Sequence, residues 1–421
     1  MVQTLFHIPE RVAGIPLFGA GLLLAVWAVA SLVFLAWLAW RQGFNADTLG
    51  YVPLLLLIGA LIGWVLPRIS EAGLGLPIRG YGVMLLLAVV SGTALTVWRG
   101  RQVGLDADWV ITLVFWGFIP GIIGARMFYV IEYWPNFQRL TFGETFLAII
   151  NITEGGLVVY GSLLGGMLGF GALILREKLP SLATLDLVVP GMLLGLALGR
   201  IGCFLNGCCF GGACDLPWAV RFPAGSPSYA QQAQKGEVFL YGLKILGAAD
   251  DPPAITAVEP GSEAEKEGLK AGQHVRSING FSVLTVDDAQ LLLLAAHRRG
   301  PEIRVETAER RGVVRLAVPS PLPRGRPIHP TQLYSAIDAF VLCLFLLAYA
   351  PFTRRDGELL ALLLTFYPIN RFLMEFIRTD EPGVLWTRLS IGQIISLLLL
   401  TAAAGLWVYV LRRPPGKAYP P

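Results

Sequence analysis

Two arginines stand in long stretches of sequence that otherwise carry almost no charge. Arg200 lies 14 residues beyond Asp186, and Arg371 lies 13 residues beyond Glu358. If both stretches are helices that start at one membrane face, each guanidinium group lies about 20 Å along its helix. An ionisable group inside a span costs about 2.5–3.5 kcal/mol on insertion scales and needs a partner. Two guanidinium groups at one level favour an anion, such as a phospholipid phosphate, that a planar fork can bind bidentately.

A polar stripe continues along the segment that carries Arg371. Tyr367, Arg371, Glu375 and Arg378 follow at i, i+4, i+8 and i+11, so they share one helix face. Pro368 is expected to kink this helix and to free a backbone carbonyl. An ion pair between Arg371 and Glu375 that merely satisfies both charges stays open as the alternative to anion binding.

A third segment combines closely spaced glycines with one hydroxyl group. Gly161, Gly165 and Gly169 have small-xxx-small spacing, which predicts close packing against a neighbouring helix. Packing explains the glycines. Tyr160, near the expected outer end of the same span, is not explained in this way.

These residues must be positioned by membrane helices. Of the 421 residues, 55% are hydrophobic and only 15% are charged, against about 45–50% and about 25% in soluble domains. Nine spans are expected, at about 15–40, 51–66, 81–98, 109–131, 157–175, 183–203, 335–351, 358–377 and 390–411. The formal net charge is +4 and basic residues occur in ones and twos, which argues against a nucleic-acid partner.

Lys and Arg residues in the short loops set the expected orientation, because cytoplasmic loops carry an excess of them. The richer side carries Arg41, Arg99, Arg101, Arg176, Lys178, Arg354, Arg355, Arg412, Arg413 and Lys417. The other side carries Arg11, Arg68, Arg79, Arg139 and Arg388. The C-terminus is therefore expected in the cytoplasm and the N-terminus outside.

The front of the chain contains an internal repeat. Ile15-Pro-Leu-Phe-Gly-Ala-Gly recurs as Leu76-Pro-Ile-Arg-Gly-Tyr-Gly, and Arg41-Gln-Gly-Phe-Asn-Ala-Asp recurs as Arg101-Gln-Val-Gly-Leu-Asp-Ala-Asp. We interpret this as a duplicated helical hairpin. Chance similarity between apolar helices stays open as the alternative.

Residues from about 231 to 319 break the apolar pattern with dense charge and turn signals. The expected elements are a strand from Ile255, a short helix ending at Gly268, a strand ending at Asn279-Gly280, a helix at 286–296 and strands at 302–308 and 312–318. By parity, this α+β insert lies outside the cytoplasm.

The order of elements in the insert resembles a PDZ domain of the bacterial type. Leu240-Tyr241-Gly242-Leu243 is similar to the loop in which such domains bind a peptide's C-terminal carboxylate, while the peptide adds a strand to the sheet. Tyr241, Gly242 and Leu243 are therefore candidate peptide-binding residues, and a protein C-terminus is the implied partner. A degenerate module that serves only as a spacer is the alternative.

The segment Gly199-Arg200-Ile-Gly-Cys-Phe-Leu-Asn-Gly-Cys-Cys-Phe-Gly211 resembles the signature of prolipoprotein diacylglyceryl transferases. Further blocks follow in the family's order: Tyr81-Gly-Val-Met84, Gly121-Ile-Ile-Gly-Ala-Arg126, Gly155-Gly…Tyr160-Gly, His329-Pro-Thr-Gln-Leu-Tyr334 and Tyr367…Asn370-Arg371-Phe…Glu375-Phe-Ile-Arg378. The resemblance covers about 78–230 and 324–412. It implies a polytopic α-helical membrane protein, here with about nine spans and an inserted α+β PDZ-like domain.

The resemblance also implies a domain organisation. An extra N-terminal transmembrane hairpin takes up 1–77. The transferase core takes up 78–230 and 320–412, with the PDZ-like domain at 231–319 between its parts and a cytoplasmic tail at 413–421.

The implied enzyme moves the diacylglyceryl group of phosphatidylglycerol onto the lipobox cysteine of prolipoproteins in the bacterial cytoplasmic (inner) membrane, and releases glycerol phosphate. No cofactor or metal is implied. The implied catalytic residues are Arg200, Arg371, Tyr160 and His329, with both arginines on the leaving phosphate. The implied substrate-binding residues are Tyr81, Arg126, Asn206, Gly211, Tyr367, Glu375 and Arg378.

The general base is left open by the sequence. Tyr160 stands where many members carry a histidine, and a phenol with a pKa near 10 is a poor base at neutral pH, so hydrogen bonding is its favoured role. His329 is the alternative, although Pro330 after it favours a structural role at the start of a helix.

The signature departs from the family at Cys203, where asparagine is common, and at Cys208, where glutamate is common. With Cys209 and Cys214 these make four thiols within 12 residues. Disulfides are favoured over zinc, because there is no Cys-x2-Cys pair and the compartment is oxidising. Cys343, inside a span, is expected to be a small apolar residue.

Three other functions remain as alternatives. A catalytically inactive family member would act as a membrane scaffold through its PDZ-like domain. A redox membrane protein would use the cysteine cluster. An intramembrane protease lacks its chemistry here, because neither His-Glu-x-x-His nor Gly-x-Ser-x-Gly occurs in a span.

Overall fold

The computed structural model describes residues 3–43, 45–70, 75–138, 141–151, 156, 158–296, 300–310, 312–319, 321, 323–378 and 389–419. The chain forms two compact units. One unit comprises Val2–Val83 and Asp106–Leu179, and the other comprises Met84–Leu105 and Pro180–Pro421. Arg139, Gly155 and Arg388, which the sequence analysis uses, lie outside the described residues.

Seven helices among the described residues are long and apolar enough to cross a membrane. They are Leu22–Arg41, Thr48–Ile69, Gly80–Gln102, Ala107–Glu132, Ser181–Asn206, Thr331–Phe352 and Ile391–Arg412. The other two predicted spans are also helical: α8 (Val159–Arg176) has a shorter apolar part, and α14 (Glu358–Glu375) carries charged residues. The protein is thus a polytopic helical membrane protein, and the count of nine spans stays a prediction.

The N-terminal segment begins with short strands rather than with the predicted helix. Strand β1 (Thr4–Ile8) pairs antiparallel with β4 (Leu76–Arg79), and β2 (Arg11–Val12) pairs with β3 (Ile15–Pro16). The prediction of a span from residue 15 is therefore wrong at its start, because α1 (Leu22–Gln42) begins only after this hairpin.

In the first copy of the repeat, the second helix of the hairpin is broken into four parts. These are α2 (Ala46–Gly50), α3 (Val52–Ala60), the π-helix η1 (Leu61–Val65) and α4 (Leu66–Ile69). The helix ends agree with the repeat. Helices α1 and α5 (Gly80–Gln102) both end at the glutamine of the repeated Arg-Gln, and a new helix begins at Ala46 in one copy and at Ala107 in the other.

Close helix packing dominates the unit that contains α6 (Ala107–Glu132) and α8. A Cβ atom on Gly161, Gly165 or Gly169 would collide with backbone carbonyl groups of α6, as the small-xxx-small spacing predicts. Two smaller helices follow α6: the 3₁₀-helix η2 (Trp134–Phe137) and α7 (Phe142–Ile150).

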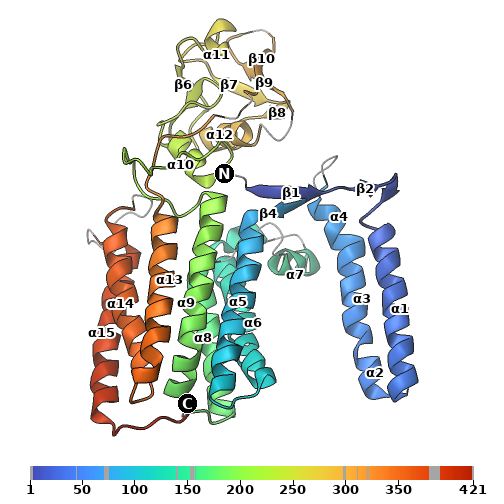
Figure 1. Ribbon diagram of the computed structural model, residues 1–421. Coiled ribbons are helices and arrows are strands. Elements are labelled where there is room, and N and C mark those ends of the chain that lie inside the picture. Colours follow the sequence, from blue (N-terminus) through green and yellow to red (C-terminus); the bar gives the residue numbers. More distant parts are fainter. Residues whose placement is uncertain are drawn as a thin grey trace. The chain divides into compact units, whose positions relative to one another are not determined.

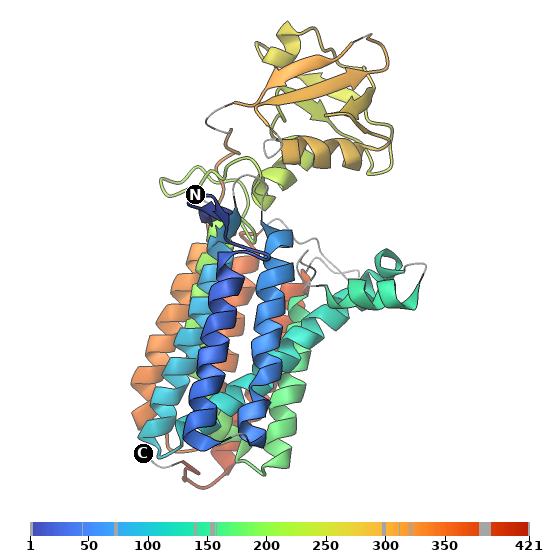
Figure 2. The ribbon, with the colours of Figure 1, turned by 90° about the vertical axis from the view of Figure 1, so that its right-hand side faces the viewer.

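In the other unit, α9 (Ser181–Asn206) packs against α13 (Thr331–Tyr349). A 3₁₀-helix, η4 (Ala350–Phe352), follows α13, and α14 packs against α15 (Ile391–Arg412). Figures 1 and 2 show α13, α14 and α15 side by side, in orange to red. The shared core of α9, α13 and α14 includes Val189, Leu193, Ala339, Leu346 and Leu359.

Arg99 lies inside α5 and not in a loop, so its predicted place is wrong. Its Nη1 donates hydrogen bonds to the carbonyl oxygens of Asp186 and Leu187, both at 2.6 Å. Pro190 has no N–H group, which leaves the Asp186 carbonyl without its usual helical donor. Arg99 therefore replaces a missing backbone donor and ties α5 to α9.

The insert contains every element predicted for it: β6 (Ile255–Val258), α11 (Glu263–Lys266), β7 (Val275–Ile278), α12 (Val286–Ala295), β9 (Glu302–Thr307) and β10 (Val314–Ala317). It adds β8 (Phe281–Ser282), α10 (Pro227–Gln234) and β5 (Leu243–Ile245). The sheets have the strand orders β10-β9-β7-β8 and β5-β6, and Figure 2 shows α12 alongside the strands.

The insert begins earlier than the predicted boundary at residue 231. Tyr229 and Ala233 of α10 belong to the buried core of the insert. The Tyr229 hydroxyl donates to the Phe239 carbonyl at 3.1 Å, and burial raises the pKa of Tyr229 to about 12. Helix α10 is therefore part of the inserted domain.

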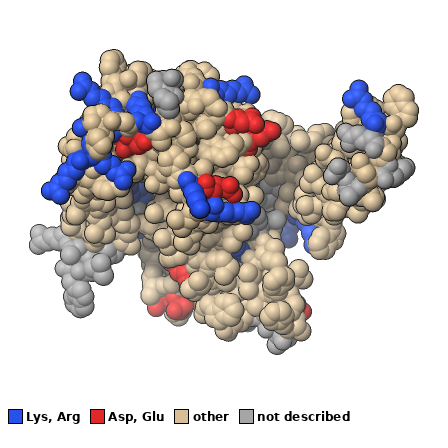
Figure 3. All heavy atoms as spheres, turned by 90° about the horizontal axis from the view of Figure 1, so that it is seen from below, with Lys and Arg blue, Asp and Glu red and all other residues tan. Residues whose placement is uncertain are grey.

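Basic side chains occur in the loop between α13 and α14 and at the end of α15. Figure 3 shows Lys and Arg side chains, with a few Asp and Glu, in the view from below. Arg354 and Arg355 lie between α13 and α14, and Arg412 and Arg413 lie at the end of α15. Gly416 N–H donates to the Arg354 carbonyl at 3.0 Å, so both groups lie at one end of their helices.

The packing of α6 on α8 yields a prediction with a control on the same helix. Gly165→Ala should lower the free energy of unfolding by about 1–3 kcal/mol, because its Cβ atom would overlap backbone atoms of Pro120. At Gly171 a Cβ atom would meet nothing within 4 Å, so Gly171→Ala should be neutral or stabilising. Thermal unfolding in detergent, followed by circular dichroism, measures both variants. Equal effects would contradict the close contact.

Candidate active site

Arg200 of α9 and Arg371 of α14 line one pocket together with side chains of α13. The lining residues are Leu196, Arg200, Ser335, Asp338, Tyr367, Asn370, Arg371 and Met374. Of the predicted site residues, the structure thus brings Arg200, Tyr367 and Arg371 together.

A carboxylate at the far end of α9 fixes the register of the two arginine-bearing helices. Asp186 accepts hydrogen bonds from the N–H groups of Gly357 at 2.7 Å and Leu360 at 2.8 Å, at the start of α14. This position also complements the helix dipole. Arg200 follows Asp186 by 14 residues and Arg371 follows Leu360 by 11, about 21 and 17 Å of helix. One interaction therefore aligns both guanidinium groups.

Arg371 forms an ion pair with Glu375 one turn further along α14. The Glu375 side chain is only 3% exposed and that of Arg371 19%. Glycine at position 392 of α15 makes room for the pair, because a Cβ atom there would lie 2.9 Å from Arg371 Nη2. The second Glu375 oxygen, Oε1, has no hydrogen-bond partner among the described residues. The structure therefore contains the predicted ion pair, and Arg371 also lines the pocket.

Three polar residues of the pocket have no role in the sequence analysis: Ser335, Asp338 and Asn370. Asp338 of α13 accepts a hydrogen bond from Asn370 Nδ2 of α14. The stretch at 335–351 was predicted as a span without a role for Asp338, although an acidic residue inside a span is itself a signal of a functional or paired site. Asn370 was quoted as part of a motif without a role.

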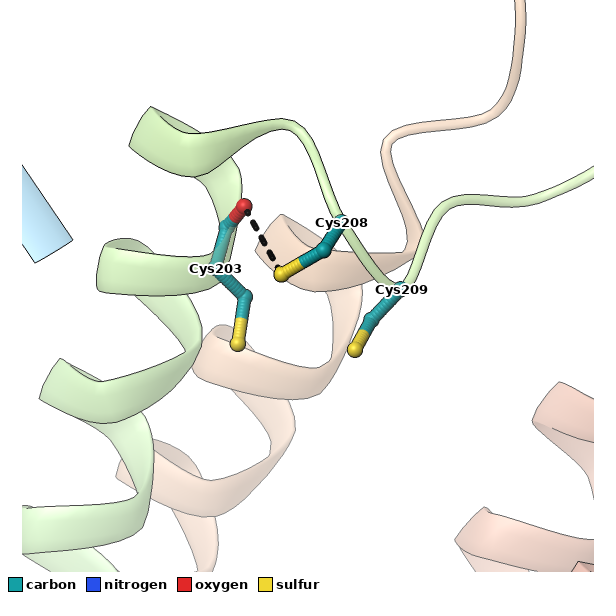
Figure 4. Close-up of side chains that lie close together, drawn as sticks. All are labelled: Cys203, Cys208 and Cys209. Atoms are coloured by element: carbon teal, nitrogen blue, oxygen red, sulfur yellow. Dashed lines mark hydrogen bonds between the residues drawn. The ribbon is translucent and has the colours of Figure 1, made fainter. Parts of the chain in front are cut away.

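Three of the five cysteines converge at the end of α9. The Sγ atoms of Cys203, Cys208 and Cys209 lie within 4.8 Å of one another, and Figure 4 shows the side chains around a common space. All five cysteines are free, so the expected disulfides are not formed. Cys214 is buried apart from this group, and Cys343 is buried in the α9–α13 core as expected.

The thiol of Cys209 lies in a strongly polar environment. Hydrogen bonds with the Cys203 and Cys208 thiols, and then the positive charges of Arg200 and Arg378, lower the pKa of Cys209 to about 2. Arg378 lies just beyond the end of α14, and its positive charge acts on the Cys209 thiol. Asn206, the last residue of α9, hydrogen-bonds the Cys208 thiol. Arg200 therefore connects the pocket with the cysteine group.

The loop after α9 is held in one conformation. Gly207 ends the helix in the left-handed region with φ +80°, and its carbonyl accepts from Ser228 N–H at 3.1 Å. Cys209 also has a positive φ of 57°, which is uncommon for a residue with a side chain. Its carbonyl accepts from Thr331 Oγ1 at 2.8 Å, and the Cys208 carbonyl accepts from Gln332 Nε2 at 2.6 Å.

His329 and Gly211 pair through their backbones. Gly211 N–H donates to the His329 carbonyl at 3.0 Å, and His329 N–H donates to the carbonyl of the next residue, Gly212, at 3.0 Å. A Cβ atom on Gly211 would lie 2.7 Å from His329 Cβ, so only glycine fits. The His329 ring lies 3.4 Å, Nδ1 to Oη, from Tyr334. The geometry of both residues is that of a structural junction before α13.

The remaining predicted residues, Tyr81, Arg126 and Tyr160, belong to the other unit. Arg126 is buried, and its guanidinium donates to the carbonyls of Ala148, Ile149, Asn151 and Gly156 at 2.6–3.1 Å. These contacts hold the end of α7, a role unlike the predicted substrate contact. Tyr81 and Tyr160 are 42% and 40% exposed.

The predicted peptide-binding loop of the insert has two successive left-handed residues, Tyr241 with φ +53° and Gly242 with φ +80°. Leu243 N–H donates to the Leu240 carbonyl at 2.9 Å, so this N–H group already has an acceptor within the loop. Among the described strands, β5 pairs only with β6. Gln290 Nε2 of α12 donates to the Ile245 carbonyl at 2.7 Å and holds α12 beside β5.

Comparisons with known proteins match most of the chain to one family. A family model described as prolipoprotein diacylglyceryl transferase matches residues 67–409. A phosphatidylglycerol–prolipoprotein diacylglyceryl transferase of Rhodopirellula baltica is 33% identical over 442 residues, which cover 96% of this chain and 88% of that protein. A second such protein, transferase 2 of Clostridium perfringens, is 26% identical over 82% of this chain and 94% of its own length.

Proposed function

The chain belongs to the prolipoprotein diacylglyceryl transferase family, and we propose that it moves the diacylglyceryl group of phosphatidylglycerol onto the lipobox cysteine thiol of a prolipoprotein. The observation that carries the proposal is the pocket in which Arg200 and Arg371 meet from separate helices. The relatives' names supply the two substrates. The two guanidinium groups that line the pocket supply donors for the phosphate that links the lipid's two halves.

The chemistry explains why two guanidinium groups are needed. The substrate thiolate attacks the glycerol carbon that carries the phosphate ester, the C–O bond breaks, and glycerol phosphate leaves with the bonding electron pair. Negative charge therefore grows on the phosphate oxygens in the transition state. Arg200 and Arg371 stabilise this charge from fixed positions. Glu375 holds Arg371 in place, and Arg371 lines the pocket while it is paired.

The polar side chains that line the pocket match the hydrogen-bonding chemistry of the same lipid's headgroup. The glycerol headgroup has hydroxyl groups that donate and accept hydrogen bonds, and we assign Asp338, Asn370 and Ser335 to them. Tyr367 lies in the same lining. We retain Tyr160 and His329 as the candidates for proton transfer that the family resemblance offers, with Tyr81 as a substrate contact.

We propose that the protein lies in the bacterial cytoplasmic membrane with its C-terminus in the cytoplasm and the insert outside. The support is the concentration of basic side chains at the loop between α13 and α14 and at the end of α15 (Figure 3). This orientation sets the Cys203 end of α9 on the outer side, where secreted precursors arrive.

We also propose that the insert is a PDZ-like module that binds an extended peptide C-terminus. Supporting features are β5, which among the described strands forms a sheet only with β6, α12 beside it, and the left-handed turn at Tyr241-Gly242. The module would hold a partner or a substrate tail near the membrane.

The transfer reaction gives the direct test. Purified full-length protein in detergent should form a thioether between labelled diacylglycerol from phosphatidylglycerol and a synthetic lipobox peptide. Arg200→Ala and Arg371→Ala should each lower kcat/KM by about 10²–10³-fold, since each removes a donor to the developing charge. Arg101→Ala, at an exposed position at the end of α5, should leave the rate unchanged. No product with the wild type would favour an inactive scaffold instead.

Peptide binding by the insert can be tested on the same full-length protein. A fluorescent peptide with a free apolar C-terminus should bind, measured by anisotropy, and its C-terminal amide should not. Gly242→Ala should weaken binding at least tenfold, because its Cβ atom would lie 2.7 Å from Ser262 Cβ and distort the loop. Gly261→Ala is the matched control, with φ +77° and nothing within 4 Å. Equal binding of peptide and amide would contradict the proposal.

A further inference from the structure

The cysteine group at the end of α9 is not explained by the clamp on the phosphate. Its three thiol groups come from the last turn of a helix and from the loop that follows, and their sulfur atoms lie within 4.8 Å of one another. Cys203 follows Arg200 by three residues, so the two lie on one face of α9, about 4.5 Å apart along the helix. The group is therefore within one helical turn of the phosphate clamp.

The size of the group fits a metal ion better than a disulfide. Zinc–sulfur bonds of about 2.3 Å in a tetrahedral site place the sulfur atoms about 3.8 Å apart, so a contraction of about 1 Å completes the site. A disulfide takes up only two sulfur atoms, at about 2.0 Å, and leaves the third thiol of the group without a role. Zinc has no redox chemistry.

The surroundings hold the cysteines as a built metal site requires. Gln332 and Thr331, at the start of α13, donate to the carbonyls of Cys208 and Cys209. Cys209 keeps its uncommon left-handed backbone, which turns its side chain to the other two. Such outer contacts orient ligands and limit their motion.

The group has one open position. Among the described residues no fourth His, Cys, Asp or Glu joins it. Three protein ligands and one free position are the arrangement of catalytic rather than structural zinc sites. A second observation points to a ligand here: Gln332 is fully buried, and its Oε1 has no hydrogen-bond partner among the described residues. An N–H or O–H group of an incoming ligand would satisfy it.

We propose that Cys203, Cys208 and Cys209 bind one zinc ion, whose fourth position takes the thiol of the substrate peptide and holds it as a thiolate. This inference rests on the proposed transfer reaction and gives the substrate thiol a route to deprotonation that needs neither Tyr160 nor His329 as a base. Coordination removes the thiol proton, which passes to water. The sulfur then forms the S–C bond, the C–O bond breaks, and its electron pair leaves with glycerol phosphate at Arg200 and Arg371. Zinc keeps its oxidation state throughout.

Zinc content provides a test that does not depend on activity. Full-length protein, purified in detergent without chelator and incubated with zinc under reducing conditions, should retain about one zinc per chain by mass spectrometry after dialysis. Cys203→Ser, Cys208→Ser and Cys209→Ser should each lose most of it. Cys214→Ser, a buried cysteine outside the group, should keep it.

Cobalt in place of zinc tests the open position in the wild-type chain, so a folding defect in a serine variant does not decide the result. A lipobox peptide with its cysteine should change the thiolate–cobalt absorption, and the same peptide with serine should not. Less than a tenth of a zinc per chain, or equal zinc in Cys209→Ser, would overturn the site. Full transfer by zinc-free protein would overturn it and leave the proposed function intact. Zinc binding without transfer would uphold the metal site and refute the function.

Discussion

The site depends on the two hydrogen bonds that the Asp186 carboxylate accepts from the first turn of α14. These bonds join α9 to a residue more than 170 positions away in sequence, at the end of the helices opposite to the pocket. Because both helices are regular, fixing their register at one end fixes it at the other. Arg200 and Arg371 meet as a consequence, and so do the polar side chains that α13 adds between them.

Charge balance makes this arrangement tolerable inside a membrane. The pocket region contains two guanidinium groups and two carboxyl groups, those of Asp338 and Glu375, and each carboxyl group has a partner on α14. Removing two charges from water costs free energy, which a buried ion pair recovers only if its geometry is good. Removing one partner leaves the other charge buried and unpaired. The Arg371–Glu375 pair and phosphate binding are compatible, because Arg371 lines the pocket while it is paired with Glu375.

Much of this could be predicted from sequence, because it depends on local spacing. The glycine face of α8, the elements of the insert and the part of the polar stripe that lies on α14 follow from helix and strand periodicity. Arg378 was predicted on the same helix face, but α14 ends at Glu375. The contacts of Arg99, Asp186 and Asp338 could not be predicted, since their partners lie on other helices. The convergence of Cys203, Cys208 and Cys209 requires the left-handed residues after α9, which no spacing rule gives. The backbone contacts of Arg126 and Leu243 could not be predicted either, and their binding roles stay predictions.

The central claim is that the guanidinium groups of Arg200 and Arg371 hold one phosphate together. Calorimetric titration of glycerol phosphate into the wild type, Arg200→Lys, Arg371→Lys and the double variant measures this directly. Lysine keeps the charge but loses the bidentate fork. Each single variant should bind at least tenfold more weakly, and the double variant should lose less than the product of the two factors, because both groups donate to the same phosphate. Unchanged affinity in either single variant, or strictly independent losses, would contradict the account.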